Sequence, residues 1–435
     1  MKSLLVILTT ILASFYFFPF EFTFMPGINT KMAMAGIGLI WFIFNIAKAR
    51  KGEIDKDFLV LALLGISLSI FSLIAMTANN TRDGSFLTYI VSMSVWLGGA
   101  YVVINTIKKV HGYISVELVC NYLIAVCVCQ CLIAYTMTIV PSLKEFVDSF
   151  LGGEDAFMGK AGDRMYGVGA ALDVSGLRFS AVLVMLAYVS MKHSSKNKIT
   201  SLLYVIAFFI IAIIGNMMAR TTTVGVMLTL LLWLFYSILN GKEDNTVLLW
   251  KWLSLVAIVV IPCIVLKYNT DIYFKEKIRF AFEGFFSLVE TGKWATRSND
   301  ILLNHMIVFP DSVKTWIIGD GYGGNPSNDP YYIGPSYHGF YMGTDIGYLR
   351  FLFYFGVFGT LALISLISYA AYTCIKRFPS YRIMFLFILA VNLIVWFKVS
   401  TDIFMVFALF LCITEDHSKI DSEQNETFIP DSLNR

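Results

Sequence analysis

Long apolar runs with almost no charged residues dominate this sequence, and they leave few folds open to the chain. The runs cover residues 3–24, 31–47, 58–77, 86–107, 115–140, 175–191, 201–218, 223–240, 247–267, 346–375, 382–397 and 400–414. A bilayer core requires about 20 apolar residues for each helical crossing. Runs this uniformly apolar suit helices rather than the alternating strands of a barrel. We therefore expect an all-α, polytopic integral membrane protein with about 12 transmembrane helices.

The composition agrees with this fold class, because 57% hydrophobic and 14% charged residues are far from the averages of soluble domains. The seven cysteines lie in or beside the apolar runs, in an odd number and without the spacing of zinc ligands. They are Cys120, Cys127, Cys129, Cys131, Cys263, Cys374 and Cys412. We therefore expect neither a disulfide-built outer domain nor a metal site.

Lysine and arginine residues are concentrated in every second loop between the runs. They are Lys48, Arg50, Lys51 and Lys56, then Lys108 and Lys109, then Lys192, Lys196 and Lys198, then Lys376, Arg377 and Arg382. Short basic loops stay in the cytoplasm, so we expect both termini on that side. Loop 141–174 and the long loop 268–345 between helices 9 and 10 are then extracytoplasmic. We treat residues 1–414 as a single transmembrane domain that includes both loops, and 415–435 as a polar cytoplasmic tail.

The stretch IIGDGYGG, Ile317 to Gly324, has the glycine content of loops that wrap backbone N–H groups around a phosphate. It lacks the Lys and Ser/Thr that end a P-loop, and no strand and helix flank it as such a loop requires. Two interpretations stay open. The glycines supply only turns, which we favour, or they help to bind the phosphate of a lipid.

Three arginines stand near the outer ends of apolar runs, where the expected topology makes cations scarce. Arg220 lies in ARTTTVG at the mouth of the eighth run, and Arg178 and Arg350 lie about one turn inside the sixth and tenth runs. All three helices run inward, so their N-termini, which attract anions, face outward. An arginine in hydrocarbon costs about 2.5 to 3.5 kcal/mol, so these residues indicate a site unless they snorkel to headgroup phosphates. Guanidinium groups suit the bidentate binding of a diphosphate.

The long loop contributes further candidates. Residues 273–290 alternate apolar and charged side chains at helical spacing, which predicts a helix on the membrane surface. The stretch RSNDILLNHMIVF predicts a second helix with Arg297, Ile301 and His305 on one face, so that Arg297 faces a substrate. We expect His305 to be packed among its apolar neighbours.

Near the end of this loop, His338 lies among aromatic residues and seven residues before Asp345. A histidine can take a proton from a hydroxyl near neutral pH, so His338 is the first candidate for a general base, with Asp345 second and Glu21 third. Tyr337 and Tyr341 are candidates for stacking on sugar rings, although packing explains them equally well.

Taken together, these stretches resemble the Wzy-type O-antigen and capsule polysaccharide polymerases, which are related to the O-antigen ligases. The resemblance depends on about a dozen spans, on the arginine of ARTTT, and on a long late loop with LLNH, IIGDGYGG, YHGF and TDIGYLRFLFYFGVFG in this order. As topology it covers most of the chain, and as motifs it covers Arg220 to Gly225 and Arg297 to Gly359. No single motif is diagnostic, so the combination carries the resemblance.

The resemblance implies a glycosyltransferase of the bacterial cell inner membrane, with its active site facing the periplasm or exterior and no metal or other cofactor. Such a polymerase transfers a growing glycan from undecaprenyl diphosphate to the non-reducing end of a lipid-linked repeat unit, and makes O-antigen, capsule or exopolysaccharide. Its partners are that lipid-linked oligosaccharide and membrane lipid, with a chain-length regulator and a flippase as further candidates and no nucleic acid.

In this family, arginines of the outer loops bind the diphosphate and a loop histidine helps the acceptor. The expected site has His338, Arg297 and Asp345 in catalysis, although the family's usual His-Asn pair is His338 and Gly339 here. Five arginines are candidates for diphosphate binding: Arg220, Arg297, Arg350, Arg178 and Arg164. The family often takes one arginine from the earlier outer loop, for which both Arg164 and Arg178 qualify.

Other functions stay open. An O-antigen ligase uses the same donor with a lipid A core acceptor. A lipid-linked oligosaccharide flippase or another transporter also has about twelve spans, and a membrane scaffold needs no catalysis. We favour the enzyme over the transporter because the two halves of the chain are unlike and the charges lie near the outer ends of the spans.

Overall fold

The computed structural model describes residues 2–49, 55–152, 164–193, 198–240, 244–329, 332–337 and 339–413. Helices form nearly all the regular structure of this part of the chain, which confirms the all-α class. In the first third they are α1 (Lys2–Phe17), α2 (Thr30–Ala49), α3 (Lys56–Asn79), α4 (Tyr89–His111), α5 (Val116–Ile139) and α6 (Pro141–Phe150). Two short antiparallel strands, β1 (Glu21–Phe22) and β2 (Leu151–Gly152), also pair here.

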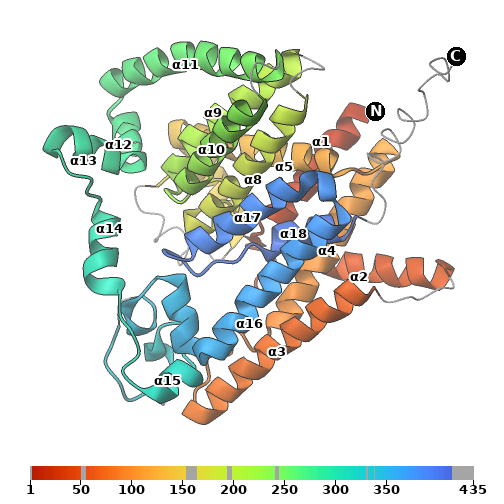
Figure 1. The fold of residues 1–435 in the computed structure, drawn as a ribbon, viewed down its shortest axis with the longest axis vertical. Coiled ribbons are helices and arrows are strands. Elements are labelled where there is room, and N and C mark those ends of the chain that lie inside the picture. The colour runs from red at the N-terminus through yellow and green to blue at the C-terminus, as the bar shows by residue number, and fades with distance from the viewer. Residues whose placement is uncertain are drawn as a thin grey trace, which may run out of the picture.

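The middle of the chain forms α8 (Leu172–His193), α9 (Lys198–Met218), α10 (Thr222–Asn240), α11 (Asp244–Thr270), α12 (Ile272–Ala281) and α13 (Glu283–Thr291). It continues with α14 (Arg297–Ile301), a π-helical turn (Leu302–Met306) and α15 (Val313–Ile317). The last helices are α16 (Gly347–Arg377), α17 (Arg382–Val395) and α18 (Phe404–Leu411). In Figure 1, α3 and α16 lie side by side, and α11 lies across the end of the group formed by α9 and α10. The surface helix expected over 273–290 is divided into α12 and α13 at Phe282.

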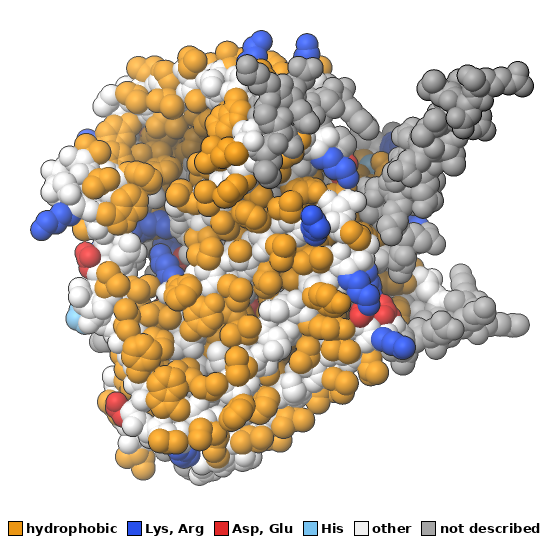
Figure 2. All heavy atoms as spheres, viewed as in Figure 1, with side chains coloured by type: hydrophobic (Ala, Val, Ile, Leu, Met, Phe, Trp, Pro, Cys, Tyr) orange, Lys and Arg blue, Asp and Glu red, His pale blue; other side chains and the backbone are white. Residues whose placement is uncertain are grey.

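Within the described residues, seven helices are long and apolar enough to cross a membrane: α3, α4, α5, α8, α9, α11 and α16. The helices α1, α2, α10 and α17 are apolar but shorter, and α18 has only 8 residues. At 1.5 Å per residue, α18 is about 12 Å long, less than half of a bilayer core. Hydrophobic side chains cover most of the face in Figure 2, as expected for contact with lipid. The protein is a helical membrane protein, and the count of 12 spans stays a prediction.

Basic residues that end several helices gather at one end of the bundle, called here the basic end. Arg377 is ion-paired with Asp55, and Lys376 Nζ lies 3.3 Å from Asp57 Oδ2. Lys192 Nζ donates to the hydroxyl of Tyr381 at 2.9 Å. The connections before α3, after α8 and after α16 therefore share one end, and the long connection from α11 to α16 belongs to the opposite end, called here the loop end.

A close approach of α8 and α10 fixes the turn that carries Arg220. A Cβ atom at Gly225 would lie 2.3 Å from the Cα of Ser180, so only glycine allows this contact. The Ser180 hydroxyl accepts the N–H of Gly225 at 3.0 Å and donates to the carbonyl of Thr221 at 2.9 Å. The sequence ARTTTVG thus holds Arg220 at the loop end because the residues after it are bound to α8.

The helix α16 is interrupted near its N-terminal third. Phe355 has φ −135° and Gly356 has φ 68°, both outside helical geometry. The carbonyls of Phe353 and Tyr354 accept N–H groups from Asp320 (2.6 Å) and Gly321 (3.0 Å) of the glycine-rich stretch. Carbonyls freed by a break in a membrane helix need such partners, so the glycine-rich stretch completes α16 at the break.

Candidate functional site

A group of seven charged side chains gathers at the loop end, and we name it the charged cluster. It consists of Arg164, Arg220, Arg350, Lys398, Asp173, Glu283 and Asp345. The charges of Asp173, Arg220, Arg164 and Asp345 all act on Lys398, and those of Arg350, Asp173, Lys398 and Arg164 all act on Asp345. Four cations and three carboxylates leave the cluster with one excess positive charge.

Arg220 and Arg164 approach each other over one aromatic ring. The guanidinium carbons of Arg220 and Arg164 lie 4.3 Å and 5.4 Å from the centroid of the Phe280 ring in α12. Each guanidinium also has its own carboxylate, since Arg220 is ion-paired with Glu283 and Arg164 Nη1 lies 3.6 Å from Asp173 Oδ2. Both side chains are largely buried, with 18% and 27% of their surface exposed. The structure thus brings two of the expected arginines together.

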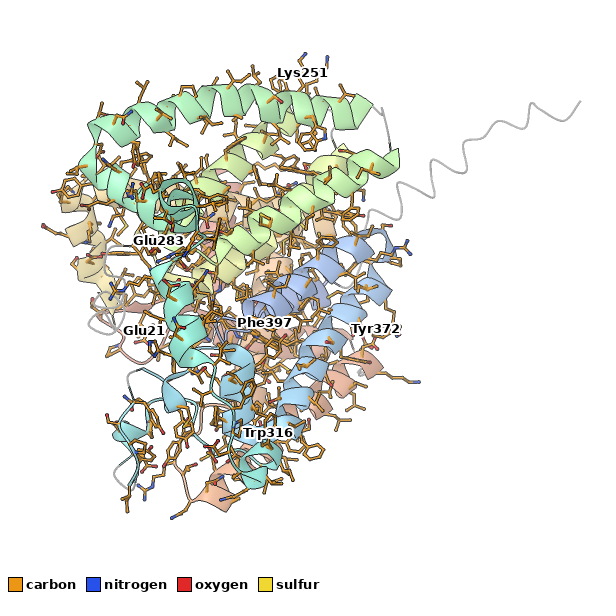
Figure 3. The ribbon with its side chains drawn as sticks, turned by 60° about the vertical axis from the view of Figure 1, so that its left-hand side comes forward. Glu21, Lys251, Glu283, Trp316, Tyr372 and Phe397 are labelled. Atoms are coloured by element: carbon orange, nitrogen blue, oxygen red, sulfur yellow. The ribbon has the colours of Figure 1, made fainter. Side chains whose placement is uncertain are left out.

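Glu283 links Arg220 to the start of α14. One oxygen of the Glu283 carboxylate contacts Arg220, and the other accepts the backbone N–H of Arg297 at 3.0 Å. Thr296 caps α14 by accepting the N–H of Asn299 at 3.1 Å, which orients this N-terminus. The Arg297 side chain is exposed and has no hydrogen bond or ion pair among the described residues. Figure 3 labels Glu283 at the junction of α12, α13 and the helices beneath them.

Arg350 fastens three segments of the loop end together. Its guanidinium donates to the Ser400 hydroxyl and to the carbonyl of Gly323, the latter at 2.9 Å. It also lies 3.9 Å from Asp345 Oδ1, and the Phe340 ring covers it at 3.4 Å. Both terminal nitrogens of the guanidinium thus donate to the protein, whereas the buried Nε–H has no partner among the described residues.

Lys398 is a cation that the sequence analysis did not identify. It lies in the segment 396–403 between α17 and α18, next to Phe397, which Figure 3 labels. Within the described chain its ammonium makes no hydrogen bond or ion pair, and burial lowers its pKa, with Arg220 and Arg164 acting in the same direction. The signal in the sequence was WFKVSTDI, where Lys398 falls in the two-residue gap between two apolar runs.

Asp345 stands before α16 with 36% of its side chain exposed. Burial raises the pKa of Asp345, and the positive charge of Arg350 opposes this rise. A carboxyl group with a raised pKa binds a proton more readily than an ordinary aspartate does, which suits a proton acceptor in catalysis. The role of Asp345 as a base stays a prediction.

The glycine-rich stretch binds a carboxylate of the chain itself. The N–H groups of Gly323 and Gly324 donate to Asp83 Oδ2 at 2.8 Å and 2.9 Å. Burial acts to raise the pKa of Asp83, but these N–H groups and Ser85 outweigh it, so the pKa is lowered. The loop has the anion-binding geometry that its composition suggested, but its anion is internal.

The tyrosines proposed to stack on sugars are packed against other aromatic rings. The centroid of the Tyr341 ring lies 5.4 Å from that of Tyr337, 5.5 Å from that of Tyr322 and 5.9 Å from that of Phe353. Its hydroxyl donates to Asp320 Oδ2 at 3.2 Å. These contacts give both tyrosines a packing role in the glycine-rich region.

Of the two histidines in the long loop, the structure describes only His305. His338, the first candidate for the base, lies outside the described residues. His305 is exposed in the π-helical turn, so the expectation that it is packed in a core is wrong. Its apolar neighbours do not surround it because Leu303 and Ile307 are themselves exposed at the surface. Glu21, the third candidate for the base, accepts the backbone N–H of Gly27 at 3.3 Å in the connection from α1 to α2.

Arg178 belongs to a separate place in the bundle. It is only 8% exposed, and its guanidinium carbon lies 5.6 Å and 5.9 Å from the ring centroids of Phe18 and Trp96. It shares no partner with the charged cluster, and the charged side chain that acts on it most directly is Asp402 in the segment 396–403. Arg178 is therefore not grouped with the other expected arginines, of which Arg164, Arg220 and Arg350 belong to the charged cluster and the exposed Arg297 side chain does not.

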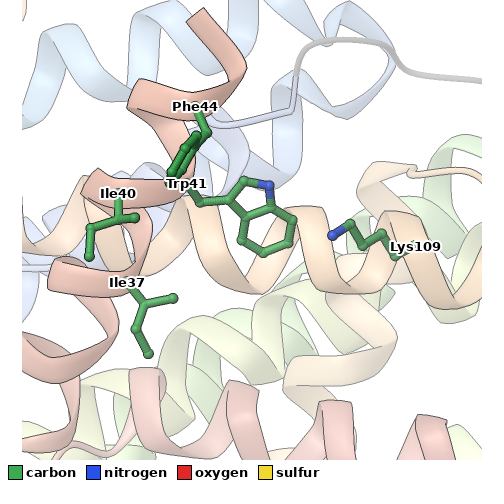
Figure 4. Close-up of a pocket in the computed structure, with 5 residues that line it drawn as sticks. All are labelled: Ile37, Ile40, Trp41, Phe44 and Lys109. Carbon is green, nitrogen blue, oxygen red and sulfur yellow. The ribbon is translucent and has the colours of Figure 1, made fainter. Parts of the chain in front are cut away.

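The apolar surface of the described residues has at least two hollows. One, of about 340 Å³, is next to Glu283 and is lined only by apolar side chains of α9, α11, α12 and α13: Ile213, Ile264, Ile278, Phe282, Phe285, Phe286 and Val289. The other, of about 360 Å³, lies near the basic end on α2 and α4, where Lys109 Nζ stands 4.0 Å from the Trp41 ring centroid (Figure 4). Only the first adjoins the charged cluster.

No group of three or more His, Cys, Asp or Glu side chains in the described part of the chain is arranged to hold a metal ion. Comparisons with protein-family models, with curated proteins and with solved structures find no match for this chain.

Proposed function

We propose that this protein is a polysaccharide polymerase of the bacterial inner membrane that transfers a growing glycan from undecaprenyl diphosphate to a lipid-linked repeat unit. The observation that carries the proposal is the charged cluster at the loop end, in which Arg164, Arg350 and Lys398 act on Asp345, and Arg220 acts on Lys398. Under this proposal the loop end faces the periplasm or exterior and both termini are cytoplasmic. The resemblance of the sequence to Wzy-type polymerases supplies the substrate class.

The main requirement of this reaction is to neutralise the negative charge on the leaving diphosphate, and positively charged side chains can do this without a metal ion. The acceptor hydroxyl attacks the anomeric carbon of the donor sugar, the bond from that carbon to the phosphate oxygen breaks, and the diphosphate leaves with the electron pair. Arg164, Arg220 and Lys398 stabilise the charge on the leaving group. The hydroxyl proton passes to a base, for which Asp345 is the described candidate and His338 the other.

The apolar hollow beside Glu283 supports a lipid substrate. Phe282 lines the hollow, and the next residue, Glu283, is ion-paired with Arg220. A diphosphate bound at Arg220 would therefore lie beside the apolar surface of α11 to α13, because the residue that pairs with Arg220 directly follows one that lines the hollow. An isoprenoid chain suits such a hollow, because no lining side chain is polar.

The test uses purified protein in lipid nanodiscs, a polyprenyl-diphosphate-linked repeat unit, a chelator and no nucleotide. A ladder of polymer is expected. Arg220→Ala and Arg297→Ala should each lower the rate about 100- to 1,000-fold, with normal amounts of protein in the membrane. Arg279→Ala is the matched control, because the exposed Arg279 pairs with Glu290 and Tyr268 and with no residue of the charged cluster among the described residues. Ladders of normal length and rate from both Arg220→Ala and Arg297→Ala would refute the assignment.

The same purified protein and lipid-linked substrate also test two other functions. Transfer of a preformed glycan to a lipid A core, without a ladder, would assign the protein as an O-antigen ligase. A flippase is the second candidate from another class, and the interruption of α16 at Phe355 and Gly356 favours it, because transporters often bind substrates at broken helices. The glycine-rich stretch fills this break, however, and the charges lie beyond it, so we prefer the enzyme.

A further inference from the structure

Arg178 presents a physical problem that the charged cluster does not solve. Arg178 is only 8% exposed, yet its guanidinium makes no hydrogen bond or ion pair with any described residue. By contrast, Arg220, Arg350 and Arg377 each bind at least one oxygen of the protein. The nitrogens of Arg178 are not among the fully enclosed unpaired polar atoms of the described chain, which include Arg350 Nε, so a small partner such as water or an anion reaches them and supplies the acceptors that the protein does not.

The surroundings of Arg178 are also positively charged. Lys31, at the start of α2, lies with its Nζ 4.3 Å from the Trp96 ring centroid, and the guanidinium carbon of Arg178 lies 5.9 Å from the same centroid. Lys31 likewise has no hydrogen bond or ion pair of its side chain among the described residues. Two cations from different helices therefore contact one indole ring, and neither has an acceptor.

Asp402 is the carboxylate whose negative charge acts on both Lys31 and Arg178, but its own hydrogen bonds are with other groups. It accepts the N–H of Phe404 at 3.0 Å and the hydroxyl of Tyr89. Its charge acts on both Lys31 and Arg178 without an ion pair to either within 4.0 Å. The centre formed by Lys31, Arg178 and Asp402 therefore has two positive charges, one negative charge and unused N–H donors.

We infer that Lys31 and Arg178 bind a small anion with a single negative charge, held beside Trp96 in the interior of the bundle. One negative charge neutralises the centre and accepts the unused N–H groups of both cations. The neighbouring Tyr16, Phe17 and Phe18 are fully buried, so we take the ligand to be a halide or a small oxyanion. The half-buried Lys31 gives such an ion its route from the surface.

The anion connects elements that are distant in the chain. Lys31 belongs to α2, Arg178 to α8 and Trp96 to α4, whereas Asp402 precedes α18. Asp402 is also two residues from Ser400, which binds Arg350, so the centre stabilises the segment that carries Lys398. The bound anion is therefore a structural ligand that holds the loop end in place, and it does not depend on the proposed glycosyl transfer.

The experiment measures the melting temperature of the purified protein while sodium chloride replaces sodium gluconate at constant ionic strength. Chloride should raise the melting temperature in a saturable way. Lys31→Met should raise the half-saturating chloride concentration about tenfold or more, since one charge-assisted hydrogen bond is lost. Asp402→Asn should lower that concentration, because it removes the competing negative charge.

Lys109→Met is the matched control. Lys109 also stands over a tryptophan, with its Nζ 4.0 Å from the Trp41 ring centroid, but it lies near the basic end (Figure 4). It should keep the chloride dependence of the wild type. Crystals grown in bromide should show an anomalous peak between Lys31 and Arg178, which tests the site without any variant.

Three results would overturn the inference. A melting temperature indifferent to chloride in the wild type would leave water as the partner of Arg178. An unchanged half-saturating concentration in Lys31→Met would place the chloride effect elsewhere. Stabilisation by anionic phospholipid in vesicles, with none from chloride or inorganic phosphate, would assign the site to a lipid head group. None of these results changes the polymer ladder, so they are distinct from a failure of the proposed function.

Discussion

Glu283 is ion-paired with Arg220, and its second carboxylate oxygen accepts the backbone N–H of Arg297 at 3.0 Å. A carboxylate that joins a guanidinium to a helix N-terminus has the position that a phosphate group of a bound diphosphate would take. Under the proposed function, substrate and Glu283 therefore compete for Arg220.

The first prediction concerns this competition. Glu283→Gln removes the negative charge and keeps the size of the side chain, so Arg220 becomes available to the substrate. The KM for the lipid-linked repeat unit should fall several-fold, about the effect of losing one partly exposed ion pair. Steady-state kinetics in nanodiscs measure this change. Glu290→Gln, which alters the exposed pair with Arg279, is the control and should leave KM unchanged. A higher KM in Glu283→Gln would mean that Glu283 positions Arg220 instead of competing for it.

The second prediction concerns Lys398, the one cation of the charged cluster without a carboxylate of its own within ion-pair distance among the described residues. Lys398→Met keeps the length of the side chain and removes the charge. Turnover should fall about 100-fold, because a preorganised cation at a developing charge is lost. Lys398→Arg should recover part of the rate, which a purely packing role would not predict. Normal turnover in Lys398→Met would remove this residue from the site.

Part of this site could be predicted from the sequence because a charge near the end of an apolar run is conspicuous. Arg220 and Arg350 were found in this way, and both lie in the charged cluster. Lys398 could not be identified in this way because apolar residues flank it closely. Asp402 lies within the apolar run 400–414, which predicts a membrane span. Residues 400–403 stay outside α18 because Ser400 and Asp402 bind groups of other helices.

The helices could be predicted from the sequence more readily than the contacts between their side chains. Because backbone groups in hydrocarbon must be satisfied within the segment, each apolar run contains a helix, although the run 400–414 is helical only over the eight residues of α18. The pairing of Glu283 with Arg220 and of Asp83 with Gly323 joins residues far apart in the chain. No periodicity encodes such contacts, so the separation of Arg178 from the other arginines could be learned only from the fold.

The third prediction is a pH dependence. Burial raises the pKa of Asp345 above its ordinary value near 3.8. The folded protein therefore binds this proton more tightly than the unfolded chain. The resulting stability is fully present below the ordinary pKa and is lost as the pH rises through the raised pKa. Asp345→Asn should remove this loss, so melting temperatures measured from about pH 4 to 8 should decline less with pH than those of the wild type. Parallel curves for the two proteins would contradict the effect.

The same substitution tests the catalytic role. If Asp345 is the base, its carboxylate must be deprotonated, so the rate of the wild type should fall as the pH decreases through the raised pKa. Asp345→Asn should lower turnover and remove this acidic limb. A variant that keeps the wild-type rate and the same limb would leave His338 as the base.

The last prediction concerns the break in α16. Gly356 has φ 68° and ψ −170°, a region open only to glycine, and a Cβ there would lie 2.2 Å from the carbonyl oxygen of Ile317. Gly356→Ala should therefore destabilise the protein by about 1 to 3 kcal/mol from backbone strain alone, with the clash in addition. Because Ile317 is the first residue of the glycine-rich stretch, this region should become sensitive to protease before the bundle unfolds. Gly36→Ala in α2 is the matched control, since nothing lies within 4 Å of a Cβ at that position and it should be tolerated. Equal melting temperatures and equal protease resistance of the two variants would show that α16 does not need the break for its stability.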